Sequence, residues 1–314
     1  MGRRRKGRPV TGIIVLDKPV GPSSNQTLQR VRRLFGAAKA GHTGNLDPLA
    51  SGVLPICLGE ATKLSQYLLD SDKAYKAQLC FGVSTTTLDS EGEVVAQSDA
   101  SALTENDVCK ALDRFVGDIE QVPPMFSALK VDGQPLYKLA RQGKEVERKR
   151  RLVSIRSIDL LGFQAGARAE ATVDVRCSKG TYIRTLSEDI AASLRLPGHM
   201  SALRRTATGP FNLVQAISLD TLAEVAEDEG PAALDRFLLD PELAVDYLPR
   251  VEVTNSAAFY LKQGQAVVVR NAPLNGMVRV AEVGGPFLGI GEILDDGRVA
   301  PKRLFVDSHQ STPL

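Results

Sequence analysis

The feature that most constrains the fold is a change in the sequence pattern at Pro249. Before it, amphipathic helical segments are interspersed with short apolar strand candidates. After it, short β-rich pieces are separated by Gly264, Gly276, Gly284, Gly285, Gly289, Gly291 and Gly297, a pattern typical of a small β-barrel. A chain of 314 residues has room for two domains. We therefore predict a basic flexible arm over 1–10, a larger domain over 11–249, a β-rich domain over 250–309 and a tail over 310–314.

Within the larger domain, local patterns predict individual elements. Strand-like patterns cover Gly12–Leu16, Ala74–Phe81, Ser154–Phe163 and Ala171–Cys177. Helices are expected from a cap at Ser24 or Asn25 to Gly36, over Glu60–Leu69, after a capping box of Thr104 and Asp107, and over Thr181–Leu194. Proline and glycine punctuate Gln121–Gly143, so we interpret about 121–151 as an insertion that leaves the core.

Composition excludes several classes of protein. No apolar run approaches the ~18–20 residues of a membrane helix, and the apolar stretch Thr11–Leu16 is too short for a signal peptide. The four cysteines are far apart and only three histidines occur, so neither a metal site nor a disulfide framework is expected. The sequence has no phosphate-binding GxxxxGK[ST] loop and no dinucleotide-binding GxGxxG turn. We expect a cytoplasmic protein without metal, nucleotide cofactor or membrane partner.

The charges are segregated, although the formal net charge is only +2. Basic residues crowd the stretches 3–8 and 141–151, whereas Asp220–Asp246 is acidic. Separated basic patches fit a polyanionic partner, although a basic run alone is more often a solvated face. The chain has no tryptophan, which argues against a broad aromatic platform for single-stranded nucleic acid.

The segment Gly41–Pro55 has neither helical nor strand periodicity and sets Asp47 among leucines and valines. Pro48 biases Asp47 toward an extended backbone, and the glycines permit tight turns. A fixed carboxylate in an apolar loop, with His42 nearby, is a candidate nucleophile or acid–base group. The same residues also fit an aspartate that caps a helix starting at Pro48, and local chemistry alone favours that second interpretation.

The segment from Gly41 to Leu54, GHTGNLDPLASGVL, closely resembles the catalytic motif of the TruB family of tRNA pseudouridine-55 synthases. Further resemblances to that family are the KPxGxxS element in Asp17–Ser24, the KxY motif in Asp72–Tyr75, the PPxxSALK segment in Pro123–Lys130, the CSKGTYIR element in Cys177–Arg184 and the LRR of Leu203–Arg205. These motifs occur in order and span most of residues 12–206.

The resemblance implies that the protein isomerises uridine 55 in the T-loop of tRNA to pseudouridine, acting on a flipped-out base. It implies an α+β fold, in which a pseudouridine-synthase core has a long mixed, largely antiparallel sheet flanked by helices. It also implies that the C-terminal part is a PUA-like β-barrel that binds RNA. The reaction involves neither redox change nor phosphate transfer, so no cofactor is expected.

Residue by residue, the resemblance makes Asp47 the essential catalytic carboxylate, Tyr75 the tyrosine that stacks on the base and Arg184 the arginine that pairs with Asp47. It places His42, Tyr182 and Leu203 in the nucleotide pocket, with Lys18, Pro19 and Asp89 in supporting positions. Candidate contacts to the RNA backbone are Lys130, Arg141, Lys144, Arg148, Lys149, Arg150, Arg151, Arg204 and Arg205. The sequence departs from the family's TDTxD turn at Thr86, where the family has an aspartate.

Three functions are weighed against these motifs. The first is a standalone, monomeric tRNA pseudouridine synthase that needs no guide RNA and no obligate protein partner. The second is an RNA chaperone that folds tRNA, and the third is a guide-RNA-dependent relative of the archaeal and eukaryotic kind. Intact Asp47, Tyr75 and Arg184 favour an enzyme, and the 121–151 insertion favours the standalone type.

Overall fold

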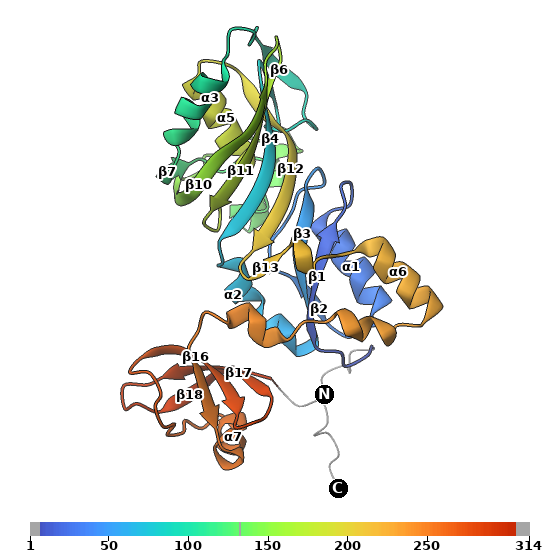
Figure 1. The fold of residues 1–314 in the computed structure, drawn as a ribbon, viewed down its shortest axis with the longest axis vertical. Helices are drawn as coiled ribbons and strands as arrows, with labels where there is room; N and C mark the ends of the chain where they lie inside the picture. Colours follow the sequence, from blue (N-terminus) through green and yellow to red (C-terminus); the bar gives the residue numbers. More distant parts are fainter. Residues whose placement is uncertain (1–6, 132, 306–314) are drawn as a thin grey trace. The chain divides into compact units, whose positions relative to one another are not determined.

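The computed structural model describes residues 7–131 and 133–305, which form two compact units (Figure 1). The described parts of unit 1 are 7–45, 54–70 and 209–305, and those of unit 2 are 46–53, 71–131 and 133–208. Most of the predicted arm and the whole predicted tail lie outside the described residues.

The first part of unit 1 contains several strands and helices. Strand β1 (Gly12–Lys18) lies between β14 (Ile217–Ser218), to which it is parallel, and the end of β3 (Ser51–Leu58). Strand β2 (Ala40–His42) pairs with β3 in antiparallel register. The remaining elements are the helices α1 (Ser24–Leu34), α2 (Ser65–Leu69) and α6 (Leu219–Asp228), the 3₁₀ helices η1 (Gly59–Leu64), η2 (Leu213–Gln215), η3 (Ala233–Phe237) and η4 (Pro241–Val245), and the two-residue strand β13 (Phe211–Asn212).

The cap of α1 differs from the prediction by one residue. Ser23, rather than Ser24 or Asn25, is the N-cap. Its hydroxyl accepts from Gln26 N at 3.3 Å, while the Gln26 side chain accepts from Ser23 N at 2.8 Å. This reciprocal capping box uses the side chain of the residue three positions after the cap, usually a glutamine or glutamate. Gln26 has that spacing from Ser23 but not from Ser24 or Asn25.

The predicted arm is shorter than 1–10. Arg8 N donates to Gly36 O at 2.7 Å, and the Arg8 guanidinium forms an ion pair with Asp235 at 2.5 Å. Val10 is buried. Residues 8–10 are therefore part of the packed unit, and Gly36, with φ of +57°, ends α1 as predicted.

The C-terminal part of unit 1 is rich in strands, as the glycine pattern predicts. Its sheet has the order β15 (Arg250–Val253), β16 (Gly276–Glu282), β17 (Phe287–Ile293) and β18 (Val299–Leu304), with only the first pair parallel. Helix α7 (Asn255–Lys262), which the sequence patterns did not predict, contributes Ala258 and Leu261 to the core beneath this sheet.

Unit 2 is built on long strands. The order is β3, β12 (Gly198–Thr208), β4 (Lys73–Phe81), β11 (Ala169–Cys177), β10 (Arg151–Gln164) and β7 (Gly117–Gln121), and every pair except β3–β12 is antiparallel. The predicted helices are α3 (Glu105–Asp113), which has the Thr104–Asp107 capping box, and α5 (Ile183–Ser193). The mixed, largely antiparallel sheet confirms the predicted α+β class. A separate hairpin consists of β5 (Val83–Thr85) and β6 (Val94–Gln97).

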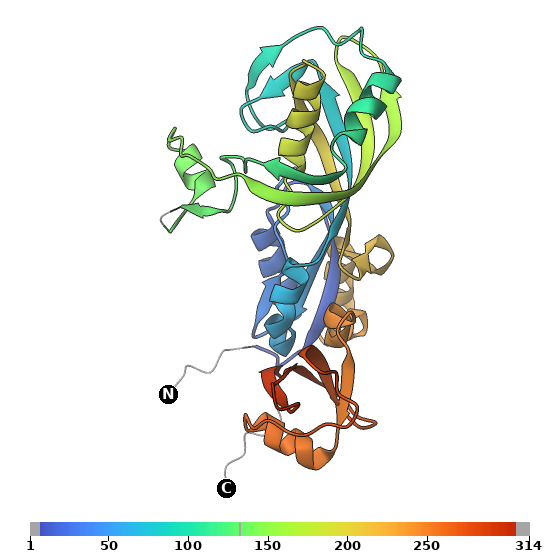
Figure 2. The same ribbon diagram turned by 90° about the vertical axis from the view of Figure 1, so that its left-hand side faces the viewer.

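The predicted insertion leaves this sheet between β7 and β10. It contains a two-stranded hairpin of β8 (Lys130–Val131) and β9 (Gln134–Pro135), followed by the short helix α4 (Leu136–Ala140). Figure 2 shows these green elements standing clear of the strands of unit 2. The insertion ends where β10 begins, at Arg151.

The four cysteines are free thiols in two environments. Cys57, Cys80 and Cys177 are buried in strands, whereas Cys109 is exposed on α3. Burial raises the pKa of Cys57 and of Cys177 to about 11.

Candidate active site

The candidate catalytic carboxylate lies in a turn that precedes β3. Ala50 N donates to Asp47 O at 3.0 Å, Pro48 and Leu49 form the turn, and the strand begins at Ser51. No helix starts at Pro48, so the helix-capping interpretation of Asp47 is wrong. The Asp47 side chain remains 41% exposed, open enough for a ligand to reach its oxygens.

The Arg184 side chain binds this carboxylate from the first turn of α5. Its Nη2 lies 3.0 Å from Asp47 Oδ2 and donates to the carbonyl of Phe126 at 2.8 Å. Its Nη1 lies 3.3 Å from Asp89 Oδ2 and donates to the carbonyl of Thr87 at 3.1 Å. The Arg184 side chain is only 6% exposed, so these contacts fix its guanidinium.

The buried carboxylate of Asp89 belongs to a turn between β5 and β6. Thr87 Oγ1 and Glu91 N both donate to Asp89 Oδ1, at 2.5 and 3.1 Å. The turn is held to β12 because Met200 N donates to Leu88 O at 3.1 Å.

At the departure from the family pattern, Thr86 Oγ1 accepts from Glu93 N at 3.2 Å. The hydroxyl thus caps the turn with an oxygen, as an aspartate side chain can.

Tyr75 is buried on β4, directly opposite Arg205 of β12. Burial raises the pKa of Tyr75, and the positive charge of the Arg205 guanidinium acts in the opposite direction. Arg205 is only 1% exposed and its Nε donates to the carbonyl of Val53 at 2.7 Å. The prediction that Arg205 contacts RNA phosphates is therefore wrong, because the residue is buried.

Tyr182 precedes α5 and is held by residues that sequence reasoning missed. Tyr182 N donates to Gln121 Oε1 at 3.0 Å, and Gln121 Nε2 donates back to Tyr182 O at 3.3 Å. Burial raises the pKa of the Tyr182 hydroxyl, while the neighbouring Ser127 hydroxyl opposes the rise. Ser127 lies within the PPxxSALK match, which is the only sequence signal that pointed to it. No sequence signal pointed to Gln121.

Gly52 permits the approach of β3 to β12. Its φ is +100°, and a Cβ there would lie 2.2 Å from the carbonyl oxygen of Arg205. No other residue fits this position without displacing one of the two strands.

The remaining predicted site residues are divided between the units. Leu203 is half-buried on β12, opposite Ala77 of β4. In unit 1, Lys18 is fully buried at the end of β1, and its Nζ donates to Pro19 O at 2.9 Å. His42 ends β2 opposite Ile56. Asp47, Tyr75, Asp89, Arg184, Tyr182 and Leu203 all lie in unit 2.

Most of the candidate RNA-backbone residues are solvent-exposed. The exposed members are Lys130, Arg141, Lys144, Lys149, Arg150 and Arg151. Arg148 is half-buried and donates to the carbonyl of Pro123 at 3.2 Å. Arg204 is also half-buried, with Nη1 donating to Ser51 Oγ at 3.3 Å.

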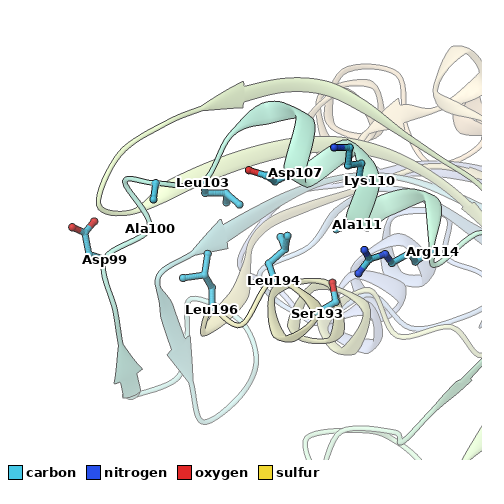
Figure 3. Close-up of a pocket in the computed structure, with 11 residues that line it drawn as sticks. Asp99, Ala100, Leu103, Asp107, Lys110, Ala111, Arg114, Ser193, Leu194 and Leu196 are labelled. Carbon is cyan, nitrogen blue, oxygen red and sulfur yellow. The ribbon is translucent and has the colours of Figure 1, made fainter.

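A cavity of about 400 Å³ lies elsewhere in unit 2, between α3 and the end of α5 (Figure 3). Leu103, Leu194 and Leu196 line it beside Lys110 and Arg114, and it contains none of the predicted site residues. In the described part of the chain, no group of three or more His, Cys, Asp or Glu side chains could hold a metal ion. Nor does any described helix have the length and apolar character needed to cross a membrane.

Comparison with known proteins identifies the class. The family description "TruB family pseudouridylate synthase (N terminal domain)" matches residues 32–183, and two descriptions of TruB C-terminal domains match 184–246 and 249–305. The "tRNA pseudouridine synthase B" of Saccharophagus degradans is 54% identical over 98% of this chain and 99% of its own length. The protein of the same name from Pseudomonas aeruginosa is 54% identical over 96% of this chain and 98% of its own.

Solved structures show the same fold. The "Crystal Structure of a Cbf5-Nop10-Gar1 Complex" contains a chain with a TM-score of 0.72 and 26% identity, covering 94% of this chain and 85% of the other. The "archaeal box H/ACA sRNP Nop10-Cbf5 complex" gives a TM-score of 0.71 at 22% identity, with 100% of this chain and 95% of the other covered. Fold and site thus define a pseudouridine synthase, an RNA-modifying isomerase. The chain belongs to the TruB family of these enzymes.

Proposed function

We propose that this enzyme isomerises uridine 55 in the T-loop of tRNA to pseudouridine, with Asp47 as its catalytic carboxylate and without cofactor or guide RNA. The observation that carries the proposal is the ion pair of 3.0 Å between the enclosed Arg184 and the exposed side chain of Asp47. The full-length relatives named tRNA pseudouridine synthase B support tRNA as the substrate.

The reaction needs a carboxylate held at a fixed orientation. The N1–C1′ bond of the nucleotide breaks, the base rotates and a C5–C1′ bond forms, while the C5 proton leaves and N1 gains one. No atom is gained or lost, so no oxidant, reductant or leaving group is required. Asp47 serves either as the nucleophile or as the base that assists deprotonation at the ribose, and Arg184 holds its Oδ2 in either case.

The two site tyrosines provide aromatic surface for the displaced base. Taking a base out of a folded loop costs a few kcal/mol, and stacking on an aromatic ring recovers ~1–3 kcal/mol per base. Both rings belong to the surroundings of Asp47, because its charge raises the pKa of the Tyr75 hydroxyl and of the Tyr182 hydroxyl.

The exposed basic residues of 141–151 supply affinity for the phosphates of the T stem-loop. Such interactions are independent of sequence and weaken with salt, so selection of one uridine falls to the shape of the loop. The chaperone and guide-dependent alternatives make different predictions, because the first predicts binding without product and the second predicts no product until a guide RNA is added.

The deciding experiment maps pseudouridine at nucleotide resolution in an unmodified T stem-loop RNA. Purified protein is added without cofactor or guide, and Asp47→Asn is assayed in parallel. We expect product at uridine 55 with the wild type and a loss of roughly 10⁴-fold or more with the variant, at an unchanged Kd for RNA. Appreciable turnover by the variant would remove Asp47 from the proposed role.

A second experiment tests the RNA-binding insertion. We replace the exposed Lys149, Arg150 and Arg151 with glutamine. The slope of log K for RNA binding against log salt concentration is then expected to become shallower by up to about one for each phosphate that the variant no longer neutralises. Affinity measured at low and high salt reports this directly. An unchanged slope would exclude these side chains from the RNA interface.

A further inference from the structure

Arg205 occupies an unusual place for a charged side chain. It lies in the interior of β12, between β3 and β4, and only 1% of its surface is exposed. Burying a charge is costly unless hydrogen bonds compensate for the lost water. The hydrogen bonds of its guanidinium therefore indicate what the residue does.

One hydrogen bond is with the segment that follows the candidate nucleophile. Arg205 Nε donates to the carbonyl of Val53 at 2.7 Å. The backbone of Arg205 also faces Gly52 closely enough that a Cβ at residue 52 would lie 2.2 Å from its carbonyl oxygen. Arg205 thereby holds the start of β3, which the Asp47 turn enters directly.

The Arg205 side chain also faces Tyr75. The two residues are directly opposite each other on antiparallel strands, so their side chains leave the same face of the sheet. The Arg205 guanidinium counteracts the rise that burial causes in the pKa of the Tyr75 hydroxyl. A guanidinium has only donors, so a hydrogen bond between the two side chains runs from Arg205 to the Tyr75 phenolic oxygen and leaves the phenolic proton to point elsewhere.

We infer that Arg205 is a positioning residue that fixes the Tyr75 hydroxyl and the strand behind Asp47 with a single buried guanidinium. The inference rests on the proposed function, in which Tyr75 faces the base and Asp47 reacts. It replaces the expectation that both arginines of the LRR motif contact RNA. Arg205 instead sets the separation and orientation of the tyrosine and the aspartate segment.

The test separates positioning from RNA contact. In Arg205→Lys and Arg205→Gln we expect kcat to fall about 10- to 100-fold, with KM, RNA affinity and the salt slope of binding unchanged. The lysine variant is expected to retain more activity, because it keeps the charge but not the planar fork. A variant with unchanged kcat, weaker RNA binding and a smaller salt slope would overturn the inference.

A double-mutant cycle shows whether Arg205 acts through the tyrosine. Tyr75→Phe keeps the ring and removes the acceptor. In that background, Arg205→Lys is expected to have a much smaller effect on kcat than in the wild type. Full additivity would show that Arg205 does not act through the Tyr75 hydroxyl. Arg168→Gln, which removes an exposed arginine in the same unit, controls for charge and is expected to leave kcat unchanged.

A measurement without substrate keeps this inference distinct from the proposed function. The chain has six tyrosines, and Tyr75→Phe assigns one ring-carbon NMR resonance among them. Arg205→Lys is expected to shift that resonance while thermal unfolding shows a folded protein. If the wild type makes no pseudouridine, the proposed function fails while the resonance still tests the hydrogen bond. If the resonance does not move, the hydrogen bond and the inference fail.

Discussion

Two turns of unit 2 present a carboxylate to the same arginine, and they differ in what surrounds that carboxylate. Asp47, before β3, keeps 41% of its side chain exposed, whereas Asp89, between β5 and β6, keeps 3%. Asp89 accepts further hydrogen bonds from Thr87 and Glu91 within its own turn. A shared cation thus pairs with one carboxylate that is open to solvent and another that is buried and hydrogen-bonded within its own turn. In the proposed function, accessibility rather than charge pairing distinguishes the reactive carboxylate of Asp47 from the supporting carboxylate of Asp89.

Removing the shared cation is expected to have the largest effect on this arrangement. In Arg184→Met, both carboxylates lose this cation, and activity is expected to fall about 10²- to 10³-fold because Arg184 no longer orients Asp47. Leaving Asp89 buried without its cation costs about 3–5 kcal/mol of unfolding free energy. Chemical denaturation and single-turnover assays measure the two effects. Near-normal stability would mean that Asp89 does not depend on Arg184.

Changing the buried carboxylate alone is expected to have a smaller effect on activity. Asp89→Asn keeps the shape of the side chain but removes the charge that faces Arg184. We expect about a tenfold loss of kcat, since couplings within one network are ~1–2 kcal/mol, and a loss of about 1–3 kcal/mol of stability. A loss as large as that of Asp47→Asn would contradict the distinction between the reactive and the supporting carboxylate. Thr86→Asp, which restores the family residue on the same turn, serves as the control.

A third carboxylate, that of Asp189 on α5, extends the comparison, because it is partly buried beside another negatively charged side chain. Burial, together with the nearby Glu188 carboxylate, raises the pKa of Asp189 from 3.8 to about 6. The folded state therefore binds a proton that the unfolded state releases between about pH 4 and 6, and stability falls as pH rises through that window.

Asp189→Asn removes this penalty. We expect a gain of about 1 kcal/mol at pH 7, a value that allows for solvent screening, and little change at pH 4. Urea denaturation at the two pH values measures it. An equal gain at both would assign the effect to packing rather than to ionisation.

Contiguous motifs made much of the candidate site predictable. The segment around Asp47 and the strand, turn and helix that carry Tyr75, Asp89 and Arg184 were all located from short stretches of sequence. The α+β class followed from the same resemblance, and the strand-rich C-terminal part followed from its glycines.

What the sequence could not reveal depends on pairings between distant strands. β12 lies between β3 and β4, which places Arg205 inside the sheet although arginines are usually exposed. The hydrogen bonds between Gln121 and the Tyr182 backbone join residues 61 positions apart. At Pro48, local propensity favoured a helix, but the carbonyl of Asp47 instead closes a turn onto Ala50.

The distribution of the thiols has a practical consequence for experiments on this enzyme. The buried Cys57 and Cys177, with pKa values of about 11, contain almost no thiolate at neutral pH, and Cys80 is also enclosed. A maleimide dye added to the native protein will therefore couple to Cys109 on α3. Wild-type enzyme can thus carry one fluorophore on unit 2, so that encounters with RNA can be followed without first replacing any cysteine.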